Sequence, residues 1–120
     1  MAKILIVEDE AIIAMDIEYQ LKRLGHTVVG IASRGEDAIN LAAQSAPDVI
    51  LMDVRLKGTL DGIETAILIL ERQTVEIFFL TAFKDEATLQ RMQQIRHAGH
   101  MVKPVRPEMV HEAIQKVLRN

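Results

Sequence analysis

Four short apolar runs, each ending abruptly in polar residues, constrain this chain more than any other feature. The clearest is Val49 to Met52, which is followed directly by Asp53. A continuous apolar run is typical of a strand that is buried on both faces of a parallel sheet. The other runs are Ile4 to Val7 before Glu8-Asp9, Ile77 to Leu80 before Thr81, and His100 to Val102 before Lys103-Pro104. Ligands of open α/β sheets bind at the carboxyl ends of the strands, so we expect these polar residues to meet around Asp53.

The segments between these runs show helical periodicity. Ile13, Ile17 and Leu21 recur at a spacing that places them on one helix face, and Gly25 ends the pattern. The expected strands span residues 3–7, 26–32, 49–53, 76–80 and 99–102, and the expected helices span about 10–24, 36–44, 61–70, 86–96 and 107–118. This alternation predicts an α/β fold with a parallel sheet covered on both faces and right-handed crossovers.

Helix ends and helix faces give finer predictions. Ser33 is expected to cap the second helix and Asp61 the third. The apolar stripe of the fourth helix is thin, so we expect weak docking and local mobility there. The side chains expected on the buried sides of the second, third and fifth helices are Ile39, Ala42, Ala43, Ile63, Ala66, Ile67, Leu70, Val110, Ala113, Ile114, Val117 and Leu118.

Length and composition narrow the class of protein. A chain of 120 residues with 49% hydrophobic residues is expected to form one domain with a real core. It has no cysteine, so disulfides and thiolate metal sites are excluded. A net charge of -3 without a long basic run argues against direct nucleic-acid binding. No apolar stretch reaches membrane-spanning length and no signal peptide precedes the first strand, so we expect a cytoplasmic protein.

The polar residues at the strand ends suggest phosphoryl chemistry. Glu8, Asp9 and Asp53 would repel one another in a shared pocket, and Lys103 supplies only one balancing charge. Carboxylates without histidine or thiol ligands suit Mg²⁺, which commonly binds a few carboxylates together with phosphate oxygens. A carboxylate can itself accept a phosphoryl group as a nucleophile, and Thr81 can donate a hydrogen bond to a phosphoryl oxygen. Each residue alone has a commoner explanation as a helix cap or turn, so the prediction depends on their combination.

Taken together, these motifs resemble the receiver domain of two-component response regulators. The resemblance covers essentially all of residues 1–120 as one domain. It is carried by Glu8-Asp9, Asp53, Asp61-Gly62, Thr81 and Lys103-Pro104. It implies a flavodoxin-like (βα)5 doubly wound sheet, like that of the chemotaxis regulator, with strand order 2-1-3-4-5.

The resemblance also assigns roles. Asp53 would take a phosphoryl group from a histidine kinase, a phosphotransfer protein or a small phosphodonor. Mg²⁺ or Mn²⁺ would be bound by Asp9, Asp53 and the main-chain carbonyl of Arg55, with Glu8 acting through water. Thr81 would act as a switch residue.

Lys103 and Thr81 would hold the phosphoryl oxygens. The bond between Lys103 and Pro104 is expected to be cis, as is common in the family. A surface made of the fourth helix, fifth strand and fifth helix would bind an output domain or a downstream protein, and a homodimer could form through it.

Three positions depart from the family pattern. His100 stands where a tyrosine or phenylalanine is usual, Val105 where phenylalanine is frequent, and Lys57 where proline is frequent. The loop from Asp53 to Asp61 also has one extra residue. His100 is interpreted either as a half-buried polar residue or as a switch whose charge changes near neutral pH. The amino-acid sequence of this loop resembles that of receiver domains that occur alone or beside sensor and kinase modules.

Other functions remain open at this point. One is a phosphorylation-independent interaction module with the same fold, against which the intact acids argue. A phosphatase would need a further acid and a cap, and an FMN carrier would need a Ser/Thr/Gly-rich loop after the first strand. His26, His97 and His111 show no clustering that indicates a metal site. Phe83 could either gate the site or pack on the surface.

Overall fold

A computed structural model describes residues 2–82 and 86–118 as a five-stranded parallel sheet with helices between the strands. The strand order is β2-β1-β3-β4-β5, as predicted. The strands are β1 (Lys3–Val7), β2 (Thr27–Ala32), β3 (Val49–Asp53), β4 (Glu76–Thr81) and β5 (Gly99–Val102). The helices are α1 (Ala11–Arg23), α2 (Gly35–Ser45), α3 (Gly62–Leu70), α4 (Glu86–Gln93) and α5 (Pro107–Leu118). Phe83 lies outside the described residues, so both of its interpretations stay predictions.

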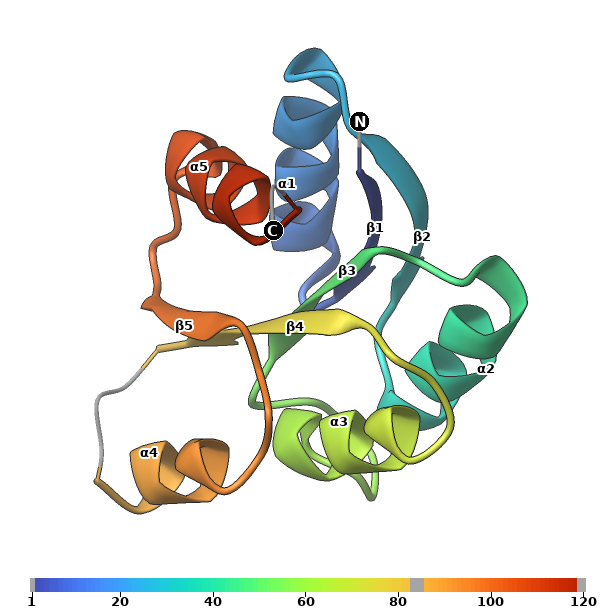
Figure 1. The fold of residues 1–120 in the computed structure, drawn as a ribbon, viewed down its shortest axis with the longest axis vertical. Helices are drawn as coiled ribbons and strands as arrows, with labels where there is room; N and C mark the ends of the chain where they lie inside the picture. The colour runs from blue at the N-terminus through green and yellow to red at the C-terminus, as the bar shows by residue number, and fades with distance from the viewer. Residues whose placement is uncertain (1, 83–85, 119–120) are drawn as a thin grey trace.

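The helices cover both faces of the sheet. Figure 1 shows α1 and α5 on one face and α2, α3 and α4 on the other. Alternate side chains of β1 divide between the two layers: Leu5 and Val7 pack toward α2 and α3, and Ile4 and Ile6 pack toward α1 and α5. Two hydrophobic cores therefore lie back to back across the sheet. This arrangement is why the central strands read as unbroken apolar runs.

The predicted cap of α3 is confirmed, and that of α2 is wrong. Asp61 accepts a hydrogen bond from the backbone of Glu64, whose side chain in turn accepts one from the backbone of Asp61. This reciprocal pair is a capping box. The N-cap of α2 is Arg34, which makes no side-chain cap bond, so Ser33 does not cap this helix.

Three residues expected in the core lie outside it. Ala43 is exposed, Ile67 is 42% exposed and Leu118 is 47% exposed. Successive helix residues point about 100° apart, so neighbours such as Ala42 and Ala43 cannot both face the sheet. In α3 the buried position is Ile69 instead of Ile67.

Helix α4 is shorter than predicted, since it ends at Gln93 and not near Arg96. Its buried residue is Met92, and Arg91 forms an ion pair of 2.8 Å with Asp61 at the start of α3. The predicted mobility of α4 stays a prediction.

The strand register brings the predicted residues to one edge. Val7 is level with Met52, Asp53 with Leu80, and Thr81 with Val102. The residues that follow or end β1, β3, β4 and β5 therefore share the carboxyl edge of the sheet. Within the described part of the chain, we find no helix with the length and apolar character needed to cross a membrane.

Candidate functional site

Asp53 is the last residue of β3 and is almost fully buried, with 4% of its surface exposed. Its Oδ1 accepts a hydrogen bond of 3.1 Å from the backbone N–H of Arg55. Its Oδ2 accepts one of 2.9 Å from the Nζ of Lys103. Both carboxylate oxygens are therefore held in place by donors from loops that follow two different strands.

Lys103 joins two carboxylates. Its Nζ lies 2.7 Å from Oε1 of Glu8 and 2.9 Å from Oδ2 of Asp53. Its backbone N–H donates a hydrogen bond of 2.8 Å to the carbonyl of Thr81, and its bond to Pro104 is cis. Burial alone lowers the pKa of Lys103, but its hydrogen bonds to Asp53 and Glu8 outweigh that effect and raise the pKa overall. Lys103 is thus held as a cation between the two acids.

The acids after β1 form a tight cluster. Carboxylate oxygens of Glu8, Asp9 and Glu10 all lie within 4.8 Å of one another. Glu8 is 1% exposed, and its Oε2 accepts a hydrogen bond of 3.1 Å from the backbone of Glu10. Burial, a hydrogen bond to Glu8 and the charge of Glu8 raise the pKa of Asp9, while Lys57 opposes them. Burial is the largest cause of the raised pKa of Asp9, and the negative charge of the neighbouring Glu8 adds to it.

A cavity of about 260 Å³ opens beside these groups. It is lined by Asp9, Glu10, Asp53, Val54, Arg55, Thr81, Ala82 and Lys103. Thr81, the last residue of β4, is buried. The lining combines carboxylate oxygens, a hydroxyl and one ammonium group. This donor set fits a hard divalent cation next to a phosphoryl group, because both are bound by oxygen and charge instead of by soft ligands.

Gly62 positions Asp53 in a way that the sequence does not reveal. A Cβ built on Gly62 would lie 1.9 Å from the backbone carbonyl oxygen of Asp53. The backbone N–H of Gly62 also donates a hydrogen bond of 2.8 Å to the carbonyl of Val54. The start of α3 therefore packs directly on the backbone of the acid, which only a residue without a side chain allows.

Other predicted residues have mixed outcomes. Glu10 is the N-cap residue of α1, and its carboxylate also lies in the acidic cluster. His100 is exposed on β5 and not half-buried, so its predicted switch role stays a prediction. Arg55 contributes its N–H to Asp53, whereas the use of its carbonyl as a metal ligand stays a prediction. His26 and His111 lie in contact, which the sequence did not indicate.

The family model of the response regulator receiver domain matches residues 4–115. The chain belongs to this family. Receiver domains are signalling domains of two-component systems, and the predicted fold class is confirmed by the observed strand order.

Similar proteins agree with this assignment. The transcriptional regulatory protein PdtaR of Mycobacterium tuberculosis is 36% identical over 85% of this receiver domain, and the match covers 49% of PdtaR. The regulator PhyR of Methylorubrum extorquens is 34% identical over 97% of the domain and 43% of PhyR. The receiver domain therefore spans about half the length of the curated relatives that it matches.

Solved structures show the same fold. The signal receiver domain of a modulated diguanylate cyclase from Desulfovibrio desulfuricans has a TM-score of 0.91 and 35% identity, covering 97% of this chain and 92% of that one. The N-terminal domain of a response regulator/sensory box/GGDEF three-domain protein from Carboxydothermus hydrogenoformans has a TM-score of 0.87 and 33% identity, covering 98% of this chain and 94% of that one.

Proposed function

We propose that this receiver domain accepts a phosphoryl group on Asp53 from a phosphorylated histidine of a kinase or phosphotransfer protein. The observation that carries the proposal is the position of Lys103 Nζ, which contacts both Asp53 and Glu8 at the edge of the acidic cavity. A buried carboxylate with a fixed cation beside it, and space in front of it, is suited to attack phosphorus.

In the proposed step, an oxygen of Asp53 forms a bond to phosphorus while the bond from phosphorus to the donor nitrogen breaks. The imidazole that leaves keeps the electron pair and takes a proton. Lys103 lies within reach of the phosphoryl oxygens, and Thr81 offers its hydroxyl from the adjacent strand end. Such transfer depends mainly on positioning and charge neutralisation, which these side chains can provide.

A divalent cation fits the proposal. Bound by Asp9 and Asp53, with Glu8 acting through water, Mg²⁺ would neutralise charge on the phosphoryl oxygens. Two acids of the cluster lie next to Asp53: Glu8 is buried and Asp9 is half-buried. Among the described residues, Lys103 is the cation in direct contact with Asp53. Excess negative charge of this kind favours cation binding.

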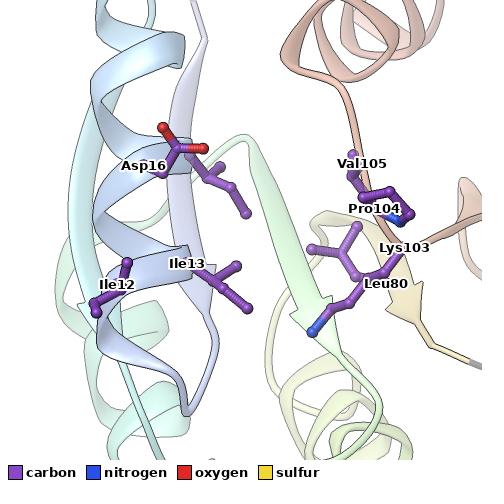
Figure 2. A pocket seen from close by; sticks show the side chains of 8 residues that line it. Ile12, Ile13, Asp16, Leu80, Lys103, Pro104 and Val105 are labelled. Carbon is purple, nitrogen blue, oxygen red and sulfur yellow. The ribbon is translucent and has the colours of Figure 1, made fainter.

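A groove beside Lys103 suits the donor protein. It has a volume of about 590 Å³ and is lined mainly by apolar side chains. Figure 2 shows Ile12, Ile13 and Asp16 of α1 on one side, with Leu80 and residues 103–105 on the other. Within this lining, Ile12 is 84% exposed. We assign this groove to an amphipathic helix of the donor, because Lys103 lines both the groove and the acidic cavity.

On the output side, we propose that phosphorylation alters the surface formed by α4, β5 and α5. His100 is exposed on β5, where a partner or a second copy of the domain could contact it. The phosphoryl charge would act as a local electrostatic change that shifts this surface between two arrangements.

The test is phosphorylation with acetyl phosphate and Mg²⁺, followed by intact mass. One phosphoryl adduct is expected for the parent and none for Asp53→Ala. Asp48→Ala is the matched control, because Asp48 immediately precedes the same strand and binds the backbone of Lys3 at the opposite edge. An undiminished adduct in Asp53→Ala would contradict the proposal, and no adduct in the parent would favour a phosphorylation-independent interaction module.

A further inference from the structure

His26 and His111 lie 85 residues apart in the sequence and are hydrogen-bonded to each other. Nε2 of His26 is 2.7 Å from Nδ1 of His111, and the ring centroids are 4.9 Å apart. His26 is 5% exposed and immediately precedes β2, whereas His111 is half-buried on α5. The contact therefore ties α5 to the turn between α1 and β2.

The other ring nitrogen of His26 has no such support. Among the described residues, its Nδ1 is a buried side-chain nitrogen without a hydrogen-bond partner. The backbone holds the ring in place, because the N–H of His26 donates to Leu21 and the N–H of Thr27 donates to Ala2. His26 cannot easily turn its Nδ1 toward water while this arrangement persists.

Counting protons shows which charge state the pair accepts. Two neutral rings carry two protons, one in the shared bond and one on an outer nitrogen. If His26 donates through Nε2, its Nδ1 is a bare acceptor and the second proton sits on Nε2 of His111. When the pair binds a third proton, both outer nitrogens must carry hydrogen if the shared bond is kept. One of these outer nitrogens is the buried Nδ1 of His26. A buried N–H without an acceptor is then created, together with a buried charge.

We propose that the His26–His111 pair is a proton-sensitive latch, which holds α5 against the α1–β2 turn when both rings are neutral and releases it when the pair is protonated.

The burial of His26 acts in the same direction as its missing hydrogen-bond partner. Burial and the neighbouring His111 lower the pKa of His26 from its ordinary value of 6.5. The charged side chains at the end of α1 and the start of α5 are exposed to solvent. They are Lys22, Arg23, Glu108 and Glu112. Because the folded pKa is the lower one, the stability from the neutral pair is present above pH 6.5 and is lost as the pH falls through the folded pKa.

Release of α5 would change the shape of the groove beside Lys103. Helix α5 starts at Pro107, and residues 104–106 connect it to Lys103. Pro104 and Val105 of this connection line the groove beside α1. The latch therefore links acidity to the shape of that surface without involving Asp53.

The test is amide hydrogen exchange of the whole chain at about pH 7.5 and about pH 5.5, corrected for intrinsic exchange. In the parent, protection of α5 amides such as Val110 and Ile114 should fall by up to about tenfold beyond any change in α3, because pH 5.5 lies about one unit below the ordinary histidine pKa of 6.5, at which a released ring gains a proton. His97→Gln is the matched control, because it removes a half-buried histidine that packs on Phe79 away from α5, and it should keep the α5-specific change of the parent. The double variant His26→Phe/His111→Leu should lose the α5-specific change.

A second measurement needs no variant. The ¹⁵N shifts of the imidazoles at neutral pH should show His26 as the Nε2–H tautomer. Equal acid loss in α3 and α5, an α5-specific loss retained by the double variant, or an Nδ1–H tautomer for His26 would each overturn the latch. Because phosphorylation enters neither measurement, this outcome is independent of the function proposed for Asp53.

Discussion

Replacing Lys103 or Asp53 should change stability in opposite directions, although the two residues form one ion pair. Lys103→Met removes the ammonium group and keeps much of the apolar stem. The side chains of Glu8, Asp53 and Lys103 are 0%, 6% and 21% exposed, so Lys103→Met leaves two nearly buried carboxylates facing each other. Asp53→Asn removes one carboxylate and leaves Lys103 paired with Glu8.

The distances set the magnitude for Lys103. At separations of 2.7 and 2.9 Å and an effective dielectric constant of about 20, each contact contributes roughly 6 kcal/mol of Coulomb attraction. The cost of removing three charges from water cancels much of this. Breaking a buried pair typically costs about 3–5 kcal/mol, and we expect the lower end for Lys103→Met because its side chain keeps some contact with water.

Asp53→Asn has a different balance. The single amide oxygen can accept from only one of the two donors, Arg55 N–H or Lys103 Nζ, so one hydrogen bond is lost, while removal of the charge relieves repulsion with Glu8, which shares Lys103. Without a divalent cation, we expect the free energy of unfolding to stay unchanged or rise by about 1–2 kcal/mol.

Urea unfolding at about pH 7.5 with a chelator measures both effects through linear extrapolation. Lys22→Met is the matched control, because Lys22 forms an exposed pair of 3.3 Å with Glu18 and should cost at most about 0.5 kcal/mol. The reasoning is refuted if Lys103→Met is as stable as the parent, or if Asp53→Asn destabilises the domain as much as Lys103→Met does.

Three further predictions test the site and its surroundings. Gly62→Ala should cost about 2–4 kcal/mol by urea unfolding, because its Cβ would overlap a backbone carbonyl, whereas Gly30→Ala, whose nearest atom would be at 3.5 Å, should cost under about 1 kcal/mol. The pKa of Asp9 is raised in the folded domain, so its charge opposes folding increasingly as the pH rises above 3.8. Asp9→Asn should therefore stabilise the domain at neutral pH. The same variant should weaken the stabilisation by Mg²⁺, measured as the rise in melting temperature. Ile12→Glu should slow transfer from a phosphorylated histidine protein by about tenfold or more but not from acetyl phosphate, while Ile67→Glu, exposed on the opposite layer, should change neither rate.

The strands and the centre of the site could be predicted because their signals are local. A strand buried on both faces must be apolar throughout, so the runs ending at Glu8, Asp53 and Thr81 marked the central strands and their carboxyl ends. Parallel pairing then brings those ends to one edge whatever the details of the helices. The contact of Lys103 with two of these acids follows from the same geometry.

Helix phase was harder to predict. The sequence of α3 is apolar at most positions, so periodicity could not distinguish Ile67 from Ile69. The choice depends on how the helix begins, where the capping box of Asp61 and the contact of Gly62 with the backbone of Asp53 fix its rotation. The contact of Gly62 is tertiary, and neither contact leaves a periodic signal. In α4 the thin apolar stripe likewise gave no clear end point, and the helix stops at Gln93.

The histidine pair could not be predicted because no spacing rule joins residues 26 and 111. Their contact follows from the order of the sheet: β2 lies next to β1, and α1 and α5 share one face (Figure 1). A search for nearby ligands along the chain therefore finds neither partner. Only the packed structure shows that a buried imidazole of His26 meets the ring of His111 on α5.

Lys103 connects these regions through bonds that a phosphoryl group would redistribute. Its ammonium group contacts Asp53 and Glu8, and its backbone N–H donates to the carbonyl of Thr81. The two residues that follow it line the groove beside α1. A phosphoryl group on Asp53 would add negative charge to a cluster that already has an excess, so Lys103 would have to turn toward the new oxygens and weaken its contact with Glu8. The same movement would be felt at the end of β4 and in the groove, which explains how one lysine could report the state of Asp53 to two surfaces.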